Sequence, residues 1–360
     1  MGQGSSKPSE EVLRDLPDSE RYFGFENFGN TCYCNSVLQS LYFCKSFRNR
    51  VLEYKQDIAD GTRSPEEQET ILSCLADLFE LVARNKKKSG YIAPRKFVGK
   101  VKSENELFRS FAHQDAHEFL SYLLNDIAET LSSANKAHGQ DVGSDAGPQT
   151  WVDELFRGKL VTETKCLWCE NVTKREEPFY DLSLEIEKNC SLTACLQRFS
   201  SAETMRDDEK FFCDRCGRKQ EAVKRMRIGS TPRILCCHFK RFKYVESVGQ
   251  MRKLTHRVVF PFDLKLRNTT DTCPDTDARF SLFAVVVHMG AHMNHGHYVA
   301  LIKSHDQWLC FDDDQVMAVT EAQVRSTFGH PQDPIMRPNG SMTGSMDHGY
   351  ILFYEMVSDD

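Results

Sequence analysis

Two widely separated pairs of cysteines restrict most strongly how this sequence can fold. Cys166 and Cys169 form one Cys-x-x-Cys turn, and Cys213, which follows Cys169 by 44 positions, begins a second one with Cys216. Four thiolates from two such turns match a structural, tetrahedral zinc site. Because this spacing exceeds that of a short zinc ribbon, the intervening stretch must fold back to join the turns. One pair alone would also fit a redox couple, but two pairs predict a zinc ion that stabilises strands with little core of their own.

The hydrophobic pattern predicts an α+β fold that begins with helices and continues with strands. Helical spacing of apolar residues predicts helices over 28–47, 72–82 and 119–127. Residues 131–150 are small and polar, which predicts a linker. The stretches that favour strands all follow this linker, at 158–165, 179–186, 223–227, 234–242, 258–260, 283–288, 297–303, 308–311 and 350–354, with polar loops at 268–278 and 330–348.

Composition limits the class of protein. The chain has 360 residues, of which 40% are hydrophobic, so it can bury a substantial core in one large or two ordinary domains. No apolar stretch approaches the ~18 residues of a membrane span, and no secretory signal is present. Fourteen cysteines without an export signal therefore indicate a reducing, cytoplasmic and/or nuclear location. The net charge of −6 and the dispersed basic residues argue against nucleic-acid binding.

Residues 1–19 are predicted to form a disordered leader with a possible lipid anchor. Gly2 follows Met1, and Ser6 and Lys7 complete an N-myristoylation pattern. An ordinary disordered tail that begins with Met-Gly is the alternative. A single acyl chain binds membranes only marginally, so we expect weak peripheral membrane association at most.

The segment 27–39 is suited to activating the thiol of Cys32. Gly29 ends an irregular stretch, and Asn30 and Thr31 are good N-cap residues, which places Cys32 in the first turn of a helix. The unpaired N–H groups and the helix dipole favour a thiolate there. The pattern predicts a nucleophile that needs a base; a buried core cysteine is the alternative.

His297 and Asp312 are the candidate base and its orienting carboxylate. If the hairpin turn between them is centred between Ser304 and His305, His297 faces Asp312 directly, with Cβ atoms ~4.5–5.5 Å apart. A one-residue slip would place the two side chains on opposite faces. Such a pair would complete a thiol triad. A satisfied surface histidine, or a metal bound by the histidine-rich segment 288–297, are the alternatives.

Together these segments resemble the ubiquitin-specific protease family of cysteine deubiquitinases. The match extends from about Tyr22 to Met356. The compact length, the bare catalytic domain and Cys34 resemble the small single-domain subgroup that WD-repeat proteins stimulate. The segments that carry the resemblance, besides the two cysteine pairs, are 24–39, 114–120, 238–242, 296–298, 308–313 and 349–354.

The resemblance implies a papain-like cysteine protease hand. The catalytic domain would span residues 20–358, with a helical thumb at about 20–130. After the linker, a β-rich palm at 151–358 would contain an insertion of zinc-binding β fingers at about 155–230.

The resemblance also implies roles for individual residues. Cys32 matches the nucleophile, His297 the general base, and Asp312 the carboxylate that orients the base. Asn27 matches the donor to the oxyanion, and Asp313 matches a second polar residue that supports the site. Four residues match positions along the ubiquitin tail: Gln114, Asp115, Gly296 and Tyr298. The loops 246–256 and 289–295 match the mobile loops that cover that tail.

The implied activity is hydrolysis of the isopeptide or peptide bond after the C-terminal Gly of ubiquitin, through an acyl-enzyme. The expected partners are ubiquitin, ubiquitinated proteins and a WD-repeat activator on the fingers, at about 160–230. The expected cofactor is one structural zinc, with no organic cofactor. Two alternatives remain: a catalytically idle ubiquitin-binding scaffold of the same fold, and another thiol acyl-transfer enzyme such as a transglutaminase, which the Gln-Asp segment and the cysteine pairs disfavour.

Overall fold

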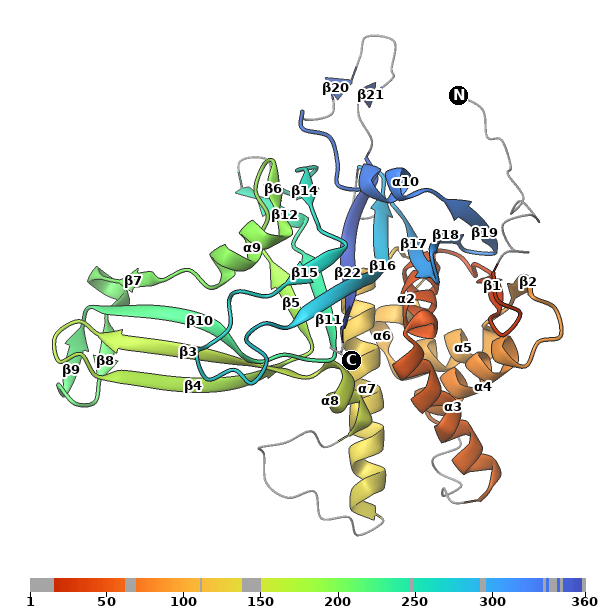
Figure 1. The fold of residues 1–360 in the computed structure, drawn as a ribbon, viewed down its shortest axis with the longest axis horizontal. Helices are drawn as coiled ribbons and strands as arrows, with labels where there is room; N and C mark the ends of the chain where they lie inside the picture. The colour runs from red at the N-terminus through yellow and green to blue at the C-terminus, as the bar shows by residue number, and fades with distance from the viewer. Residues whose placement is uncertain are drawn as a thin grey trace.

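The chain folds as a hand with three parts. The computed structural model describes residues 16–61, 69–110, 112–137, 150–246, 249–291, 296–332, 335–336, 342–343 and 346–357. A helical thumb packs against a central palm sheet, and a narrow finger sheet projects away from the palm (Figure 1). The predicted α+β fold class is confirmed.

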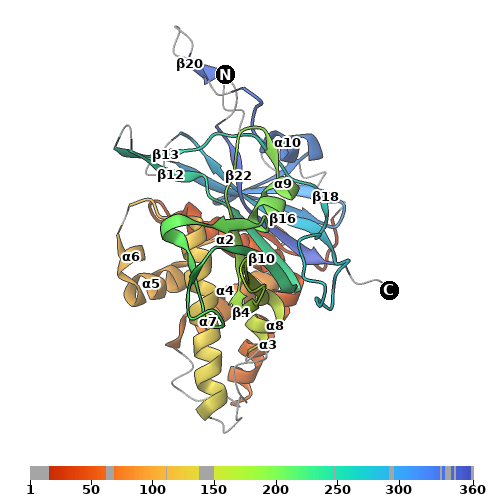
Figure 2. The same ribbon diagram turned by 90° about the vertical axis from the view of Figure 1, so that its left-hand side faces the viewer.

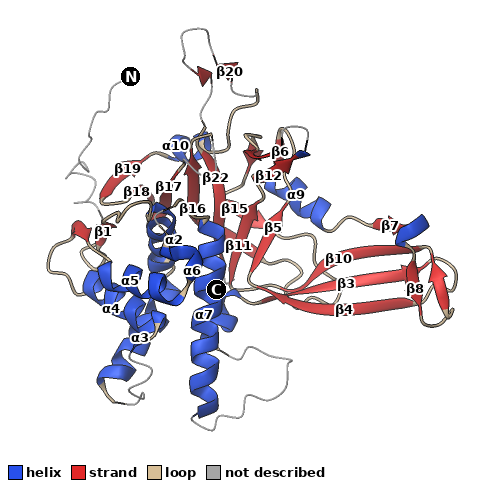
Figure 3. Cartoon of the chain, turned by 180° about the vertical axis from the view of Figure 1, so that it is seen from behind, coloured by secondary structure: helices blue, strands red, loops and turns tan. Residues whose placement is uncertain are grey.

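The thumb is built around α2 (Cys32–Phe43), which lies inside the molecule. Eleven of its twelve residues are buried, and it packs against both the palm sheet and α7. A helix that is buried on all sides in this way positions its first residue rigidly. Figure 3 shows the other thumb helices gathered on the same side of the palm. They are α3 (Lys45–Ala59), α4 (Ile71–Ala83), α5 (Arg95–Glu104), α6 (Glu106–Arg109), α7 (Ala116–Ala137) and α8 (Trp151–Phe156), with a parallel pair of strands, β1 (Tyr22–Phe25) and β2 (Ser89–Ile92).

The palm is an eight-stranded sheet, antiparallel except where β11 pairs with β5. The thumb helices lie below its strands (Figure 2). In spatial order the strands are β19 (Gln315–Val319), β18 (Gln307–Asp312), β17 (His297–Ser304), β16 (Arg279–Met289), β22 (His348–Met356), β11 (Ile234–Phe239) and β5 (Asp181–Leu184), and β15 (Asp263–Lys265) pairs with β16 beside this path.

The palm sheet separates two hydrophobic cores. Along β16, Ala284 and Val286 join the core shared with the thumb, whereas Val285 and Val287 join the core on the opposite face. This alternation follows from the two-residue period of a strand. Because both faces are covered, the central strands consist of continuous apolar runs.

The fingers consist of long strands with little core. Their sheet has the order β4 (Val172–Phe179), β3 (Gly158–Cys166), β10 (Ala222–Ser230) and β7 (Glu203–Met205), and a hairpin of β8 (Phe211–Cys213) and β9 (Arg218–Gln220) lies at their far end (Figure 1). Most side chains of β4 are exposed. The fingers therefore depend on more than hydrophobic burial for their stability.

Short elements complete the fold. No helix in the described ranges is long and apolar enough to span a membrane. The short elements are α9 (Leu192–Phe199), α10 (Glu321–Ser326), the 3₁₀ helix η2 (Asp207–Glu209), and the paired strands β6 (Cys190–Ser191) with β14 (Val258–Val259), β12 (Phe242–Val245) with β13 (Gln250–Lys253), and β20 (Ile335–Met336) with β21 (Met342–Thr343).

Several predicted boundaries are wrong. The single helix expected over 28–47 is two helices, because Cys44 adopts an extended ψ of 93° between α2 and α3. The strand expected over 234–242 divides into β11 and β12. Helix α7 continues through Ala137, so the linker does not begin at 131; residues 138–149 lie outside the described ranges.

The predicted limits of the leader and the fingers also need correction. Leu16 is buried in the thumb core, and Lys88 Nζ contacts both the Leu16 carbonyl and the Asp18 carboxylate. Residues 16–19 therefore belong to the folded domain, while Gly2 lies outside the described ranges. Within the expected finger range, β5 returns to the palm sheet, so the fingers are two separate stretches of chain.

Candidate active site

Cys32 is the first residue of α2, within the first turn as predicted, although the Thr31 hydroxyl does not cap this helix and instead accepts from the Phe28 N–H. Gly29 and Asn30 have positive φ angles of 79° and 59°, which glycine and asparagine tolerate best, so the chain turns sharply before the helix. The backbone N–H of Thr31 donates to Asn27 Oδ1 at 3.1 Å. Cys32 is only 2% exposed. The thiol is thus held at a helix N-terminus and largely shielded from water.

His297 and Asp312 meet at one end of the palm sheet. His297 begins β17 and Asp312 ends β18, and His297 Nε2 donates to Asp312 Oδ1 at 2.6 Å. The predicted hairpin register is wrong. Ala300 pairs with Phe311, so continuing this register places Asp312 opposite Val299 rather than opposite His297. The two side chains still share a face because the error is two residues, which makes them diagonal neighbours.

The imidazole of His297 lies between a carboxylate and a thiol. Its hydrogen bond to Asp312, followed by one to Cys32, raises the pKa of His297 to about 10, although partial burial opposes this effect. The ring is therefore an imidazolium at neutral pH.

Asp313 connects two asparagines beside the thiol. Asn27 Nδ2 donates to one carboxylate oxygen and Asn35 Nδ2 to the other, each at 2.8 Å. Asn35 lies on the buried α2, and Asn27 lies in the exposed turn before it. Asp313 therefore fixes the direction of the Asn27 amide relative to Cys32.

The four residues matched to the ubiquitin tail lie in different surroundings. Asp115 is buried, with one oxygen accepting from the His117 N–H and the other from the Tyr350 hydroxyl, so it caps α7. Gln114 contacts the Ser110 hydroxyl at the surface, whereas Tyr298 is buried. Gly296 packs against His288, whose Nε2 would lie 2.0 Å from an added Cβ.

Two hollows border helix α7. The smaller, of about 280 Å³, is lined by Asp115, Glu118, Glu185, Lys240 and Tyr350, among others. The larger, of about 610 Å³, lies between α7, α8 and the end of β4.

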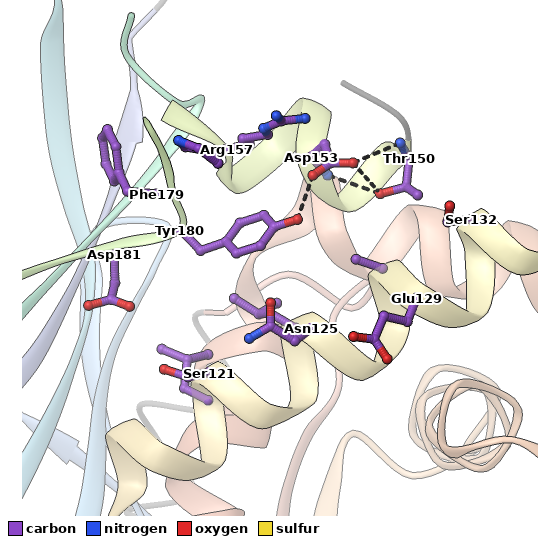
Figure 4. Close-up of a pocket in the computed structure, with 14 residues that line it drawn as sticks. Ser121, Asn125, Glu129, Ser132, Thr150, Asp153, Arg157, Phe179, Tyr180 and Asp181 are labelled. Carbon is purple, nitrogen blue, oxygen red and sulfur yellow. Dashed lines mark hydrogen bonds between the residues drawn. The ribbon is translucent and has the colours of Figure 1, made fainter. Parts of the chain in front are cut away.

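Figure 4 shows Ser121, Asn125 and Glu129 of α7 along one side of the larger hollow, with Tyr180 and Asp153 opposite. The Tyr180 hydroxyl donates to Asp153, which also forms a capping box with Thr150. His117 lines the smaller hollow and Asp181 the larger, and their contact of 2.9 Å separates the two.

The four predicted zinc ligands converge at the far end of the fingers. The sulfur atoms of Cys166, Cys169, Cys213 and Cys216 all lie within 4.8 Å of one another, and Cys169 and Cys213 are 3.6 Å apart. Tetrahedral zinc with Zn–S bonds of ~2.3 Å requires a similar sulfur spacing. The donor set therefore fits a metal ion, with Cys166 ending β3 and Cys213 ending β8.

Sequence reasoning missed Asn35, His117 and Lys253, although the first two lie inside motifs. His117 and His238 are close to Asp181, but their rings stack in parallel at 3.8 Å and 11°. Parallel stacked rings cannot both direct a lone pair at one ion, so this group is a poor metal site. Residues 292–295 of the histidine-rich segment lie outside the described ranges.

The fold and the site define a class of protein. A thiol at a helix N-terminus, beside an imidazole–carboxylate pair on a packed sheet, is the arrangement of cysteine hydrolases. Solved structures with this fold include the SAGA Ubp8/Sgf11/Sus1/Sgf73 DUB module bound to ubiquitin aldehyde, with a TM-score of 0.74 and 23% identity over 96% of this chain and 72% of that chain. The module with a substituted Ubp8, bound to monoubiquitin, has a TM-score of 0.73. It is 24% identical, over 98% of this chain and 74% of that chain.

The chain belongs to the ubiquitin carboxyl-terminal hydrolase family, whose profile matches residues 23–354. It is 50% identical to ubiquitin carboxyl-terminal hydrolase 4 of Arabidopsis thaliana, over 99% of both chains. It is 44% identical to ubiquitin carboxyl-terminal hydrolase 12 of Salmo salar, over 99% of this chain and 95% of the relative. The protein is therefore a cysteine deubiquitinase.

Proposed function

We propose that the deubiquitinase acts through a Cys32–His297–Asp312 triad and a covalent acyl-enzyme. The Cys32 thiolate attacks the carbonyl carbon of the C-terminal Gly of ubiquitin, and a C–S bond forms. His297 then gives its proton to the leaving lysine amine as the C–N bond breaks. Water, deprotonated by His297, hydrolyses the thioester and frees the ubiquitin carboxylate and the thiol. The observation that carries this proposal is the imidazole held between Cys32 and Asp312.

Asn27 is the proposed donor to the developing oxyanion. Its side chain lies beside the start of α2, and Asp313 holds its Nδ2 in place. One N–H of the amide can contact Asp313 while the second is directed at the substrate. Preorganised donors of this kind need no rearrangement when charge develops.

A ubiquitin probe with an electrophilic C-terminus tests the nucleophile. We expect the wild-type chain to form a covalent adduct under reducing conditions and the Cys32→Ala variant to form none. Cys34→Ala is the matched control, because Cys34 is equally buried in the same helix and burial raises the pKa of its thiol. Labelling that survives Cys32→Ala would reject the proposal.

The alternative of an idle ubiquitin-binding scaffold makes a different prediction. The intact geometry of Cys32, His297 and Asp312 disfavours it. Turnover of a ubiquitin–fluorophore amide, lost in Cys32→Ala while ubiquitin binding is retained, would exclude the scaffold. Binding without turnover by the wild type would support it.

We infer that the ubiquitin tail enters through the smaller hollow. Asp115, Glu118 and Glu185 line it, and carboxylates suit the arginines of the ubiquitin tail. Tyr298 is close to both Asp115 and Cys32, which connects the hollow with the thiol. Glu118→Gln should raise KM about tenfold with little change in kcat. Glu106→Gln, an exposed position on the short helix α6, should change neither.

We propose that the cysteine cluster binds one structural zinc ion. Zinc would cross-link β3 with the β8–β9 hairpin, where the strands have little core. The finger tip also exposes Leu167, Trp168, Val172 and Phe212. An apolar group at the end of an arm suits a protein partner, and we propose a WD-repeat activator there.

The partner proposal is tested by kinetics with and without a WD-repeat protein. Trp168→Ala and Phe212→Ala should abolish stimulation and leave basal turnover unchanged. Tyr91→Ala removes an equally exposed aromatic side chain from the thumb and is the control. No stimulation of the wild type would reject the proposal.

Myristoylation of Gly2 and a cytoplasmic and/or nuclear location remain proposals that rest on the sequence. Incorporation of an alkyne-labelled myristate in cells, compared between the wild type and Gly2→Ala, tests the first. Fractionation of the same cells tests the second.

A further inference from the structure

Lys253 is a buried lysine outside the triad that the proposed chemistry does not use. It ends β13 and is 8% exposed. Its ammonium donates to the carbonyls of His288 and Gly290 at 2.8 Å each, and to that of Met346 at 2.7 Å. An ammonium has three N–H donors, so these three contacts use all of them.

Two of the three carbonyls that Lys253 contacts, those of His288 and Gly290, lie on either side of Met289. Met289 is the residue that pairs with His297 in the register between β16 and β17. His288 also packs against Gly296, the residue before His297, with no room for a side chain between them. The position of the end of β16 therefore fixes the position of His297 at the start of β17.

The third contact of Lys253 fixes a further strand. Met346 precedes β22, and His348 at the start of β22 pairs with His288. Arg241 lies nearby and is fully buried, and its Nε donates to the Gly349 carbonyl. Lys253 and Arg241 thus hold the ends of β13, β16 and β22 together through their contacts with backbone carbonyls.

Burial of the ammonium has an electrostatic cost. Desolvation lowers the pKa of Lys253 to about 7, with a further contribution from Arg241 that Asp347 opposes. A methionine of similar length would avoid this cost and still fill the space. The position instead uses a charged donor that satisfies three carbonyl groups in one place.

We propose that Lys253 is a positioning residue for His297. By fixing the carbonyls on both sides of Met289, it sets where the imidazole lies between Cys32 and Asp312. This role rests on the proposed triad. It assigns to Lys253 an effect on the chemical step rather than on ubiquitin binding.

The test compares Lys253→Met with the wild type in the full-length chain. Turnover of a ubiquitin–fluorophore amide gives kcat and KM, and titration with electrophilic ubiquitin counts the active sites. We expect kcat per active site to fall about tenfold or more, with KM changed less than about twofold. Lys303→Met replaces an exposed lysine on β17, away from the loops matched to the ubiquitin tail, and should have no effect.

The pH profile separates positioning from a merely structural role. The informative alkaline limb of kcat/KM is the one near the pKa of His297, about 10, and not one near neutral pH, where Lys253 itself loses its proton. If His297 moves away from Asp312 and Cys32, its raised pKa must fall, so this limb should move to lower pH. A structural defect would reduce the number of active sites and leave this limb unchanged. Lys253→Gln, which retains two N–H donors, should shift the limb less and in the same direction, and it replaces Lys253→Met if that variant does not fold.

Two outcomes would overturn the role of Lys253. One is an unchanged alkaline limb in both variants while Cys32→Ala is inactive. The other is a fall in kcat/KM that comes from a higher KM alone, with kcat unchanged. Turnover by Cys32→Ala would instead overturn the triad itself, so the two failures are distinguishable.

Discussion

His297 and Asp312 are diagonal neighbours across β17 and β18, and His297 Nε2 lies 2.6 Å from Asp312 Oδ1. Diagonal neighbours lie farther apart than directly opposed residues, and the length of the imidazole side chain spans this larger distance. This geometry leaves the other ring nitrogen for Cys32, which lies on a different element, α2. The sheet thus orients the base, and the helix supplies the thiol.

Asp312→Asn should lower kcat/KM by about 10²- to 10⁴-fold without unfolding the chain. The carboxylate is the largest cause of the raised pKa of His297, about 10 in the wild type, so its loss lowers that pKa. The imidazolium then loses its proton at lower pH, so the alkaline limb of kcat/KM should move to lower pH. Asp306→Asn, at the exposed hairpin turn, is the control. An unshifted limb would contradict the assignment.

Asn27→Ala should lower kcat by about 10²- to 10³-fold with little effect on KM, because an oxyanion donor acts mainly in the transition state. Asp313→Ala should lower kcat as well, by releasing the Asn27 amide. The measurement is a double-mutant cycle on kcat, and we expect the two effects to be strongly non-additive.

The exposed neighbour Asp314 gives the control for this cycle. Asp314→Ala should leave kcat unchanged. Additive effects of Asn27→Ala and Asp313→Ala would mean that the carboxylate does not act through this amide.

Cys216→Ser should abolish zinc binding and lower the melting temperature, since the finger strands have little core to replace the metal. Elemental analysis by mass spectrometry of the purified chain gives the metal content, and we expect about one zinc per wild-type chain. Cys273→Ser changes a buried cysteine outside the cluster and should retain the metal. Equal zinc contents in the two variants would exclude this site.

Gly296→Ala should be strongly deleterious, because the added Cβ would lie 2.0 Å from His288 Nε2. We expect a lower melting temperature and a lower kcat, as His297 is the next residue. Gly99→Ala in α5 meets no atom within 4 Å and should instead stabilise the chain, by roughly 0.5–1 kcal/mol. Thermal unfolding of both variants checks the contrast, and a neutral Gly296→Ala would show that His288 can move aside.

Local patterns in the sequence determined the helix start at Cys32, the α+β class and the two cysteine turns. Each depends on residues close together in the chain: the N-cap pattern before Cys32, the change of hydrophobic period, and the Cys-x-x-Cys spacing. The common face of His297 and Asp312 was also predictable, because a strand alternates faces every residue. The register was not, since the position of the turn had to be assumed.

Only the tertiary structure decided which distant segments meet. The break at Cys44, the return of β5 to the palm and the continuation of α7 to Ala137 depend on packing against elements far away in the chain. The same holds for Lys253, whose three acceptors come from two other segments. A lysine in a short strand carries no sequence signal for burial, because the carbonyls that satisfy it are defined only after the strands assemble.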